Sequence, residues 1–469
     1  LNQGGWRGKP KGLRRSAPPM MARRLLHCLC WLAVVQAHEG SWFAQLSQEQ
    51  LRSMLKAPNG TRAERCAAKW PDRTVQPLRA LVLSHIGTRR VLLAALLHNN
   101  GEMLDGWLAT LESLIELIGH QQSYVSILES GSTDSTGLAL EQFAERTLLP
   151  RGVPHTVRTG ADPHTVHLPF KIGDNRTHRI QYLATLRNEV LEPVYRSPDT
   201  FSHVVFLNDV VWCAPDVLRL LANSPVNGAF LSCATDFHYW HLPDEEPPRP
   251  WIILYDQWAF LDLRGEGKPR RSCPLSRIWT VRPNRLEPGC NDDAPAPCPA
   301  NYEVVVPVYS CWNGIAAFDA EVFRRGIRFR WVDGIRASAD ECPTLSEQLV
   351  CKDMWSIGLG KVVMDTGVQV AYHDVVHSKR LRKFSSELAA IPPKLEGFDK
   401  VRPPKTWHCR GLPLPGVFAP AKEPLELRLH NKREKLGYSA DWRTWPPVVR
   451  AMALRNKKES TTREQIEIA

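Results

Sequence analysis

A loop of small and polar residues, ESGSTDST at 129–136, follows the short apolar run at 124–128. An acidic residue at the end of a strand, followed by a flexible loop and a helix start, is typical of nucleotide sites in open α/β sheets. Glu129 could accept hydrogen bonds from a base or ribose, and Gly131 would let the backbone approach the ligand closely. The alternative is that the polar residues after Gly131 only cap the next helix. The candidate nucleotide contacts in this loop are Glu129, Gly131, Ser132 and Asp134.

A second carboxylate, that of Asp209, follows another apolar run, HVVFL at 203–207, and Asn208 lies between them. It would lie at the rim of the sheet, where ligands bind in folds of this class. Asp209 is therefore the strongest single catalytic candidate in the chain. The alternatives are that Asp209 binds ribose or positions an acceptor, or that the Asn-Asp pair only begins a turn.

Aromatic residues beside amides and carboxylates suit the binding of a carbohydrate. Trp312, in the segment SCWNG at 310–314, could stack on a sugar face while Asn313 binds hydroxyl groups. The alternative is a Trp buried in the core beneath a turn. Asp236 and Asp256, which have aromatic neighbours, could line the same cleft as substrate-binding residues or simply lie in loops.

The elements that would position these residues alternate between strand and helix. Residues 91–100 predict a strand, and residues 104–120 have the apolar spacing of one helix face, with Gly119 where the helix would end. A strand, a helix and a second strand within about 40 residues form a unit with parallel strands, which indicates the α/β class. Further predicted elements are helices at 136–148 and 178–195 and strands at 203–207, 302–310 and 361–373.

The loop at 129–136 is similar to the Asp-Gly-Ser-x-Asp-x-Thr loop of nucleotide-sugar glycosyltransferases with the GT-A fold. Taken in order with YLATLRN (182–188), FLNDVV (206–211) and SCWNG (310–314), it resembles glycosyltransferase family 69, over roughly residues 90–375. These are the fungal capsule-associated α-1,3-mannosyltransferases. The resemblance implies a GT-A-like (Rossmann-like), mostly parallel α/β sheet flanked by helices, in a single catalytic domain with long proline-rich insertions. It also implies a GDP-mannose donor, retention of the anomeric configuration and a secretory-pathway location.

The resemblance assigns further roles. Asn208 and Asp209 look like the family's counterpart of the metal-binding Asp-x-Asp motif, in which a divalent cation, Mn²⁺ or Mg²⁺, would bridge the phosphates of the donor. The GT-A pattern also places an acid that faces the acceptor and a late histidine on the metal or diphosphate. Glu341 is the first candidate for the acid, followed by Glu347 and Asp353. His373 stands in the place of the late histidine, and Asp374 is the alternative beside it. A lone histidine at a strand end is otherwise structural.

Arg187 and Asn188 end an apolar helical segment and are expected to emerge near the nucleotide. The planar guanidinium group of arginine matches phosphate oxygens. If no metal ion is present, Arg187 together with Arg176 or Arg179 could neutralise the diphosphate. The competing interpretation is a surface ion pair between Arg187 and Glu189 or a neighbouring acid.

The composition excludes several classes of protein. The chain has 469 residues, of which 43% are hydrophobic and 23% charged, so it is not disordered throughout. It has no unbroken apolar run of roughly 18 to 20 residues, which excludes a multi-pass transporter. The net charge of +11 comes from the two ends, since residues 1–24 carry +7 and residues 379–469 carry +10, which leaves −6 for residues 25–378. A mildly acidic body argues against a nucleic-acid partner, and the basic ends suit solubility or anionic surfaces.

The N-terminus has the pattern of a signal peptide, because Arg23 and Arg24 precede eleven apolar residues at 25–35 and small residues follow. The alternative is a buried N-terminal helix. Glycosylation sequons at Asn59 and Asn175 fit passage through the secretory lumen. In the proline-rich stretch after residue 283, the spacing of Cys290 and Cys298 predicts a disulfide-stapled loop and not a zinc site.

The sequence predicts four segments: a signal peptide or uncertain N-terminal extension (1–37), a helical lead-in or stem (38–88), a GT-A-like catalytic domain (89–378) and a basic C-terminal extension (379–469). We expect a hexosyltransferase, an α-1,3-mannosyltransferase, that builds cell-surface or capsular polysaccharide in the Golgi lumen or membrane, with secretion as the alternative. Its partners would be a nucleotide sugar and a mannose-containing glycan acceptor, with membrane association through the N-terminus. The alternatives are a transferase that uses a UDP-sugar and a non-catalytic polysaccharide-assembly or glycan-binding protein of the same fold.

Overall fold

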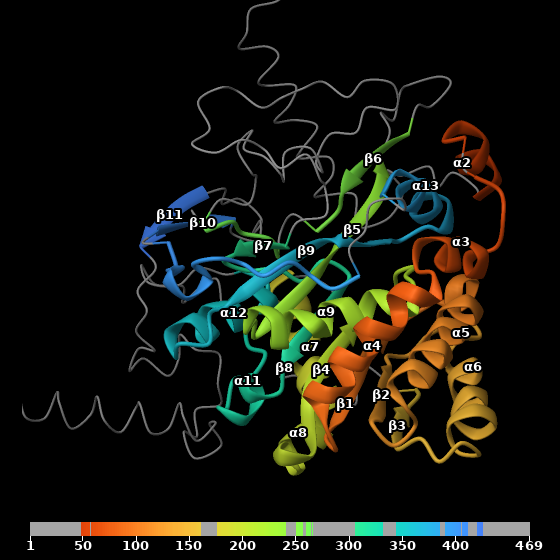
Figure 1. The fold of residues 1–469 in the computed structure, drawn as a ribbon, viewed down its shortest axis with the longest axis horizontal. Coiled ribbons are helices and arrows are strands. Elements are labelled where there is room, and N and C mark those ends of the chain that lie inside the picture. The colour runs from red at the N-terminus through yellow and green to blue at the C-terminus, as the bar shows by residue number, and fades with distance from the viewer. Residues whose placement is uncertain are drawn as a thin grey trace, which may run out of the picture.

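The computed structural model shows an α/β fold in which helices cover both faces of one sheet (Figure 1). The structure describes residues 48–56, 58–160, 176–240, 250–256, 259–263, 265, 305–331, 344–384, 390–404, 406–410 and 420–424. The predicted α/β class is therefore confirmed.

The described residues form one mixed sheet with the strand order β3-β2-β1-β4-β8-β5-β9-β7, in which β6 pairs with β5. Strands β1, β2, β3 and β4 are parallel to one another, β5 and β9 run in the same direction as these, and β6, β7 and β8 run against them. Most strands thus share one direction, as the sequence predicts. The strands are β1 (Arg90–Leu97), β2 (Ser123–Glu129), β3 (His155–Arg158), β4 (Phe201–Leu207), β5 (Leu231–Trp240), β6 (Trp251–Leu254), β7 (Val305–Val308), β8 (Ile315–Asp319) and β9 (Val362–Ala371), and a separate ladder pairs β10 (Thr406–Arg410) with β11 (Pro420–Pro424).

The helices are α2 (Gln48–Met54), α3 (Arg62–Lys69), α4 (Asp72–Ile86), α5 (Gly101–Ile118), α6 (Thr136–Phe143), α7 (Arg176–Val190), α8 (Glu192–Arg196), α9 (Ala214–Asn227), α11 (Glu321–Arg324), α12 (Ser346–Ser356) and α13 (Asp374–Phe384). Within the described ranges, none of these helices is both long enough and apolar enough to cross a lipid bilayer.

Side chains alternate along the central strands and enter two apolar layers. On β1, Leu92 and Ala94 belong to one layer, and Leu93 and Ala95 belong to the other. Helices α4, α5, α6 and α9 contribute to the second layer, and α7, α8, α11 and α12 contribute to the first. Burial on both faces explains why these strands are almost uniformly apolar in the sequence.

The predicted strand–helix–strand unit is β1–α5–β2, and α5 ends at Gly119 as the sequence predicts. The helix predicted at 136–148 consists of α6 and a π-helical turn at Ala144–Leu148. The helix predicted at 178–195 is divided into α7 and α8. Strands β5 and β8 and helix α9 were not expected from the sequence, yet they form much of the second half of the fold.

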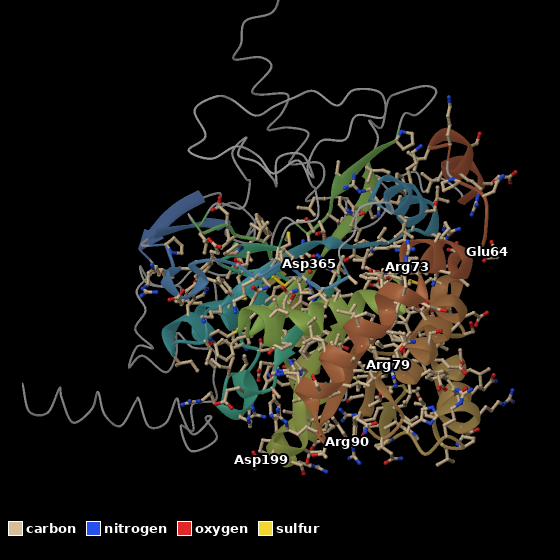
Figure 2. All side chains as sticks on the ribbon, viewed as in Figure 1. Glu64, Arg73, Arg79, Arg90, Asp199 and Asp365 are labelled. Carbon is tan, nitrogen blue, oxygen red and sulfur yellow. A yellow bond between two sulfur atoms is a disulfide. The ribbon has the colours of Figure 1, made fainter. Side chains whose placement is uncertain are left out.

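Covalent and ionic links join elements that are far apart in the sequence. One disulfide links Cys66 of α3 to Cys213, and a second links Cys233 of β5 to Cys311. Asp365 of β9 lies in the interior (Figure 2), where its Oδ2 is 2.9 Å from the Nε of Arg219 of α9 and both side chains are fully buried. The predicted signal peptide at 1–37 and the predicted pair Cys290–Cys298 lie outside the described residues.

Candidate active site

Three neighbouring parallel strands, β2, β1 and β4, end at the same edge of the sheet. Leu97, the last residue of β1, pairs with Glu129 at the end of β2, and Asn208 follows β4 directly. The loops that follow these strands therefore meet at one edge. This carboxyl edge holds both groups that the sequence singles out, the loop at 129–136 and Asp209.

Glu129 shapes the loop after β2. Its carboxylate accepts hydrogen bonds from the backbone N–H groups of Ser132 and Gly160, the second at 2.7 Å. Burial alone would raise the pKa of Glu129, but the hydrogen bonds from Ser132 and Gly160 outweigh it and hold this pKa below its ordinary value. Gly131 has φ of +72°, a conformation that side chains rarely allow. Glu129 is thus an ionised residue that fixes the loop, and its contact with a base or ribose stays a prediction.

The residues after β1 bind this same loop. The backbone N–H of Asn100 donates to Thr136 Oγ1, and that of Gly101 donates to Asp134 Oδ2, both at 2.8 Å. A Cβ atom on Gly101 would come within 2.9 Å of Asp134 Oδ2, so a side chain at position 101 would displace the carboxylate. Hydrogen bonds from Thr136 and Gly101 also hold the pKa of Asp134 below its ordinary value. Asp134 therefore accepts from the N–H of Thr136, the first residue of α6, and joins the loop to the start of α5.

Asn100 connects this loop to the segment after β4. Its Nδ2 donates to Asp209 Oδ2 at 3.3 Å, while its backbone N–H is bound by Thr136. Asp209 is partly buried, and burial raises its pKa, although hydrogen bonds from its own backbone and from Asn100 act in the opposite direction. The structure thus brings Asp209 and the loop at 129–136 to one place.

Asn208 fixes the peptide that carries Asp209. Its backbone oxygen accepts from Trp107 Nε1 at 3.0 Å, its Oδ1 accepts from Trp312 Nε1 at 3.2 Å, and its N–H donates to the oxygen of Gly314 at 3.0 Å. Trp312 is only 3% exposed, and the guanidinium of Arg187 lies over its ring, 5.0 Å from the centroid. The structure therefore favours the buried core Trp over the predicted sugar platform.

A buried carboxyl cluster lies beside this segment. Asp236 Oδ1 accepts from Asn313 Nδ2 at 2.9 Å and from the N–H of Asp256 at 3.2 Å. Its Oδ2 has no hydrogen-bond partner in the part of the chain that the structure describes. Burial, and then the charge of Asp256, raise the pKa of Asp236 to about 7. Burial and the carboxylates of Asp236 and Asp209 also raise the pKa of Tyr372 well above its ordinary value. Among the acids that the structure describes, Asp236 is thus the one best suited to hold a proton near neutral pH.

The end of β9 brings His373 to the carboxyl edge, near the segment that carries Asp209. Val211 and Ala371 form an isolated antiparallel bridge, so the segments that carry Asp209 and His373 meet at a point two residues from each of them. His373 Nε2 lies 3.2 Å from His238 Nε2. Burial lowers the pKa of His373, so its ring is neutral at neutral pH and can offer a lone pair.

Asp209 and His373 together offer one oxygen and one nitrogen, donor types that divalent cations accept. Among the residues described, only Cys213, Asp216 and His377 bring three such ligand atoms within 4.8 Å of one another. That cluster does not suit a cation, since Cys213 is in a disulfide and Asp216 is ion-paired. A cation at Asp209 would therefore complete its coordination with substrate oxygens and water, as Mg²⁺ often does. The residues present fit such a substrate-bridged ion.

Arg187 and Asn188 are engaged within the protein. Arg187 forms a buried ion pair with Glu347, with 2.6 Å between Nη2 and Oε1, and not the predicted surface pair with Glu189. The amide of Asn188 binds both backbone groups of Phe329, accepting from N–H at 3.0 Å and donating to the oxygen at 2.7 Å. Both residues thus hold α7 against the segments around them, and the structure gives no support to their predicted contact with the nucleotide.

Glu341, the predicted acid facing the acceptor, lies outside the described residues, as do the side chains of Arg176 and Arg179. The two acids ranked behind it are in buried ion pairs, Glu347 with Arg187 and Asp353 with Arg330, the latter at 2.7 Å.

Sequence reasoning missed Asn99, Asn100 and Tyr372. The sequence places residues 98–100 within a strand, whereas β1 ends at Leu97. Asn99 has φ of +53°, and its Oδ1 accepts from the N–H of Thr133 at 2.8 Å. Two consecutive asparagines at the end of an apolar strand were the signal that could have revealed this loop, because Asn tolerates positive φ and binds neighbouring backbone.

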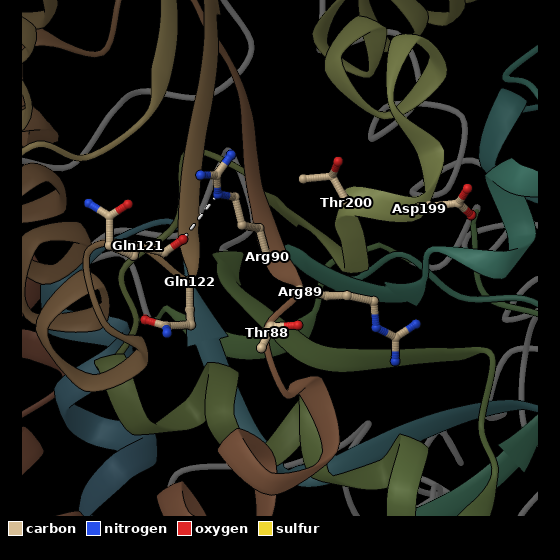
Figure 3. Close-up of a pocket in the computed structure, with 7 residues that line it drawn as sticks. All are labelled: Thr88, Arg89, Arg90, Gln121, Gln122, Asp199 and Thr200. Atoms are coloured by element: carbon tan, nitrogen blue, oxygen red, sulfur yellow. Dashed lines mark hydrogen bonds between the residues drawn. The ribbon is translucent and has the colours of Figure 1, made fainter.

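A polar cavity of about 420 Å³ lies at the opposite edge of the sheet, where β1, β2 and β4 begin (Figure 3). Its lining residues are Thr88, Arg89, Arg90, Gln121, Gln122, Asp199 and Thr200. Because β1 runs its whole length between this amino edge and Asn100, the cavity is separate from the candidate active site.

A family model described as Cryptococcal mannosyltransferase 1 matches residues 90–353, more than half of the chain. Alpha-1,3-mannosyltransferase CMT1 from Cryptococcus neoformans var. neoformans serotype D is 28% identical over 368 residues, which cover 73% of this chain and 72% of that protein. Among solved structures, the mannosyltransferase PcManGT from Pyrobaculum calidifontis, in complex with GDP-Man and Mn²⁺, is 12% identical with a TM-score of 0.33, over 71% of this chain and 72% of that one. Glucosyl-3-phosphoglycerate synthase from Mycobacterium tuberculosis is 13% identical with a TM-score of 0.31, over 64% and 75% of the two chains. The family match spans Asn100, the loop at 129–136, Asp209 and Asp236.

Proposed function

This chain belongs to the Cryptococcal mannosyltransferase 1 family, and on that premise we propose that it transfers a mannosyl group from GDP-mannose to a hydroxyl of a mannose-containing glycan. The observation that carries the proposal is the hydrogen bond between Asn100 and Asp209, which joins the loop at 129–136 to a partly buried carboxylate at the carboxyl edge. Ligands bind at this edge in open α/β sheets. The name of the similar cryptococcal protein supports an α-1,3 linkage. Retention of configuration is part of the proposal, because the mannosyl group of GDP-mannose is itself α-linked.

The residues divide the work as follows. Asp209, together with His373, would hold a divalent cation, which supplies charge to stabilise the departing diphosphate when it is bound. The loop at 129–136 positions the nucleotide, because Glu129 and Asp134 hold its backbone in one conformation. Attack occurs from the face that the diphosphate leaves, and a phosphate oxygen accepts the proton of the acceptor hydroxyl. Asp236, with its pKa of about 7, holds a proton beside this centre and limits the negative charge there.

A secretory-pathway location, in the Golgi lumen or membrane, is part of the proposal. The disulfides Cys66–Cys213 and Cys233–Cys311 support it, since disulfides persist in oxidising compartments. The product would be a cell-surface or capsular polysaccharide.

The proposal is tested by incubating the purified full-length chain and Mn²⁺ with an α-mannoside and, separately, GDP-mannose, UDP-glucose, UDP-galactose or UDP-xylose. We expect transfer from GDP-mannose to be faster than from any UDP-sugar by about a hundredfold, the scale on which a site that binds polar groups discriminates. Faster transfer from a UDP-sugar would overturn the donor assignment. Neither transfer nor donor hydrolysis with any of the four would favour a non-catalytic protein of the same fold.

A further inference from the structure

Helix α3 precedes the residues that the family model matches, yet it contacts the beginnings of three helices at the carboxyl edge. These helices are α5, α9 and α13, and they follow β1, β4 and β9. The same strands lead into Asn100, Asp209 and His373. Helix α3 therefore touches the helix that follows each of these three residues.

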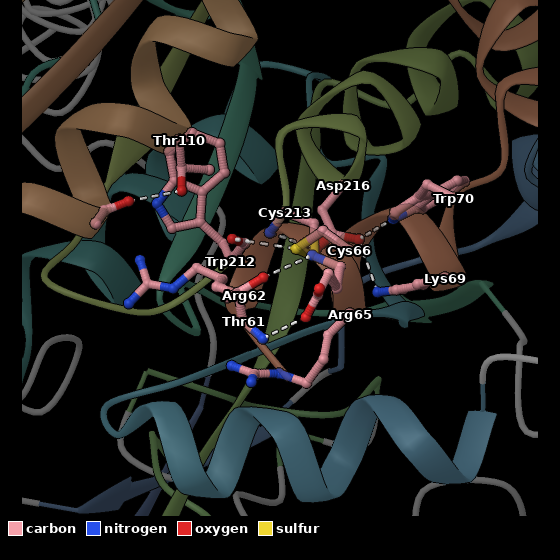
Figure 4. The surroundings of a disulfide bond; sticks show 12 residues. Thr61, Arg62, Arg65, Cys66, Lys69, Trp70, Thr110, Trp212, Cys213 and Asp216 are labelled. Carbon is pink, nitrogen blue, oxygen red and sulfur yellow. Dashed lines mark hydrogen bonds and ion pairs between the residues drawn. A yellow bond between two sulfur atoms is a disulfide. The ribbon is translucent and has the colours of Figure 1, made fainter. Parts of the chain in front are cut away.

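The contact with α9 is covalent and ionic (Figure 4). Cys66 is bonded to Cys213, four residues after Asp209. Lys69 Nζ lies 2.7 Å from Oδ1 of Asp216, whose side chain is fully buried. Asp216 Oδ2 accepts from the N–H of Cys213 at 3.0 Å, so the same carboxylate holds both α3 and the start of α9. The segment between Asp209 and α9 is thus fixed to α3 at two points.

The contact with α13 is ionic. Asp374, the first residue of α13, lies 2.6 Å from Nη2 of Arg65, 3.5 Å from Nε of Arg62 and 3.7 Å from Nη2 of Arg52. Asp374 follows His373 directly in the chain. Helices α2 and α3 therefore hold the backbone beside His373 through a single carboxylate.

The contact with α5 is close packing. A Cβ atom on Gly106 would come within 2.8 Å of Nη1 of Arg62, so α3 lies directly against the second turn of α5. Where α3 meets α13, His377 is fully buried, and burial, followed by the charges of Lys69, Arg62 and Arg65, lowers its pKa well below the ordinary value. A neutral histidine beside three cations indicates an interface that excludes water.

The pairing within the sheet explains why the segments that carry Asp209 and His373 need support from α3. In the part of the chain that the structure describes, the isolated bridge between Val211 and Ala371 is the one backbone pairing between the segment after β4 and the end of β9, so no continuous ladder sets the separation of Asp209 from His373. We propose that α3 is a positioning element of the active site, in which Arg65 and Cys66 act through Asp374 and Cys213 to hold the segments that carry His373 and Asp209 in place. This inference rests on the proposed transferase function.

The test compares Arg65→Gln with Arg324→Gln in the full-length chain. Arg324 is the matched control, because it is also partly buried and ion-paired, 2.8 Å from Glu321, but it binds the backbone of Phe201 at the amino edge. With kcat and KM for GDP-mannose measured well below the unfolding temperature of each variant, we expect Arg65→Gln to lower kcat by about tenfold or more with little change in KM. Arg65→Lys should recover part of this loss, and Arg324→Gln should stay within about twofold of wild type. Equal kcat values for Arg65→Gln and Arg324→Gln would overturn the inference.

A second readout does not depend on activity. Amide hydrogen exchange at residues 209–213 and 371–374 should become about tenfold faster in Arg65→Gln and remain unchanged in Arg324→Gln. Unchanged exchange in both variants would overturn the inference whether or not the wild-type chain transfers mannose, so its failure is distinct from failure of the proposed function. If Arg65→Gln does not fold, the double variant Cys66→Ala and Cys213→Ala replaces it, with the same two expected results and the same contrary results.

Discussion

The two edges of the sheet carry similar polar residues but use them differently. At the amino edge, Arg90 and Asp199 line an open polar cavity, and Arg90 donates to one backbone oxygen, that of Gln121, at 3.0 Å (Figure 3). At the carboxyl edge, Asn100 and Asp236 are buried, and each binds groups from two other segments of the chain. Burial and shared partners shift pKa values and fix positions, as catalysis requires. The comparison indicates that an open cavity is a poorer guide to the chemistry of this protein than polar groups shared between loops.

The largest expected difference between the edges is in catalysis. Asp209→Asn removes the carboxylate charge at the carboxyl edge and keeps its shape, so kcat for transfer from GDP-mannose should fall by about a hundredfold or more. Asp199→Asn, the matched change at the amino edge, should stay within about twofold of wild type. Steady-state kinetics of both variants test this. Equal activities would mean that the carboxyl edge is not the catalytic one.

Asp236 predicts a pH dependence of stability. Its pKa is raised to about 7 from an ordinary value of 3.8, so between these values the folded chain binds a proton that the unfolded chain has released. Stability should therefore fall as pH rises through this window. Asp236→Asn removes the ionisation and can still accept from Asn313, so between pH 5 and 7 the variant should gain about 2 kcal/mol relative to wild type. Urea unfolding with EDTA at both pH values measures this.

The two chains in that experiment share every other titrating group, so the difference between them isolates Asp236. A constant difference in free energy of unfolding between pH 5 and pH 7 would contradict the proton assigned to this residue. It would also remove the contrast between Asp236, a buried protonated acid at the carboxyl edge, and Asp199, an exposed acid at the amino edge.

The smallest expected effect concerns the loops themselves. Thr136→Val removes the hydroxyl that accepts from the N–H of Asn100, and that donor is buried, so the free energy of unfolding should fall by about 1–2 kcal/mol. Thr200→Val, the same change beside the amino-edge cavity, should alter stability by about 0.5 kcal/mol or less. Chemical denaturation of both variants measures the two changes in free energy of unfolding. Equal losses would show that the loops at the carboxyl edge are held no more tightly than those at the amino edge.

Local pattern was enough to predict most of the first half of the fold, apart from β3. The apolar spacing of α5 and the apolar runs of β1, β2 and β4 reflect burial in the core between sheet and helices. Each of these patterns can be seen within its own segment of the sequence. Helix α9 was missed because it begins with Ala214 and Pro215, contains Pro225 and is buried around most of its circumference, so no polar face marks its period. Strand β5 was missed because it carries polar residues such as Asp236 that serve the site.

The candidate site was predicted in part for a similar reason. Asp209 and the loop at 129–136 lie at the ends of strands that the sequence predicts, β4 and β2. Their place at the carboxyl edge follows from the parallel pairing of these strands with β1. The partners of Asn188 and Arg187 are Phe329 and Glu347, more than 140 residues away in the sequence, and only the folded chain shows that these pairs satisfy both side chains. Trp312 was open to two interpretations for the same reason, since the ring of a Trp after a strand suits a sugar and a core equally well.

The central claim, that Asp209 and the loop at 129–136 form one site through Asn100, is tested most directly by a double-mutant cycle on GDP binding. Isothermal titration in the presence of Mn²⁺ would give Kd values for wild type, Asn100→Ala, Asp209→Asn and the double variant. We predict a coupling energy of about 1 kcal/mol or more, so that the double variant binds GDP little worse than the weaker single variant. Strictly additive losses, or no loss from Asn100→Ala, would contradict the claim.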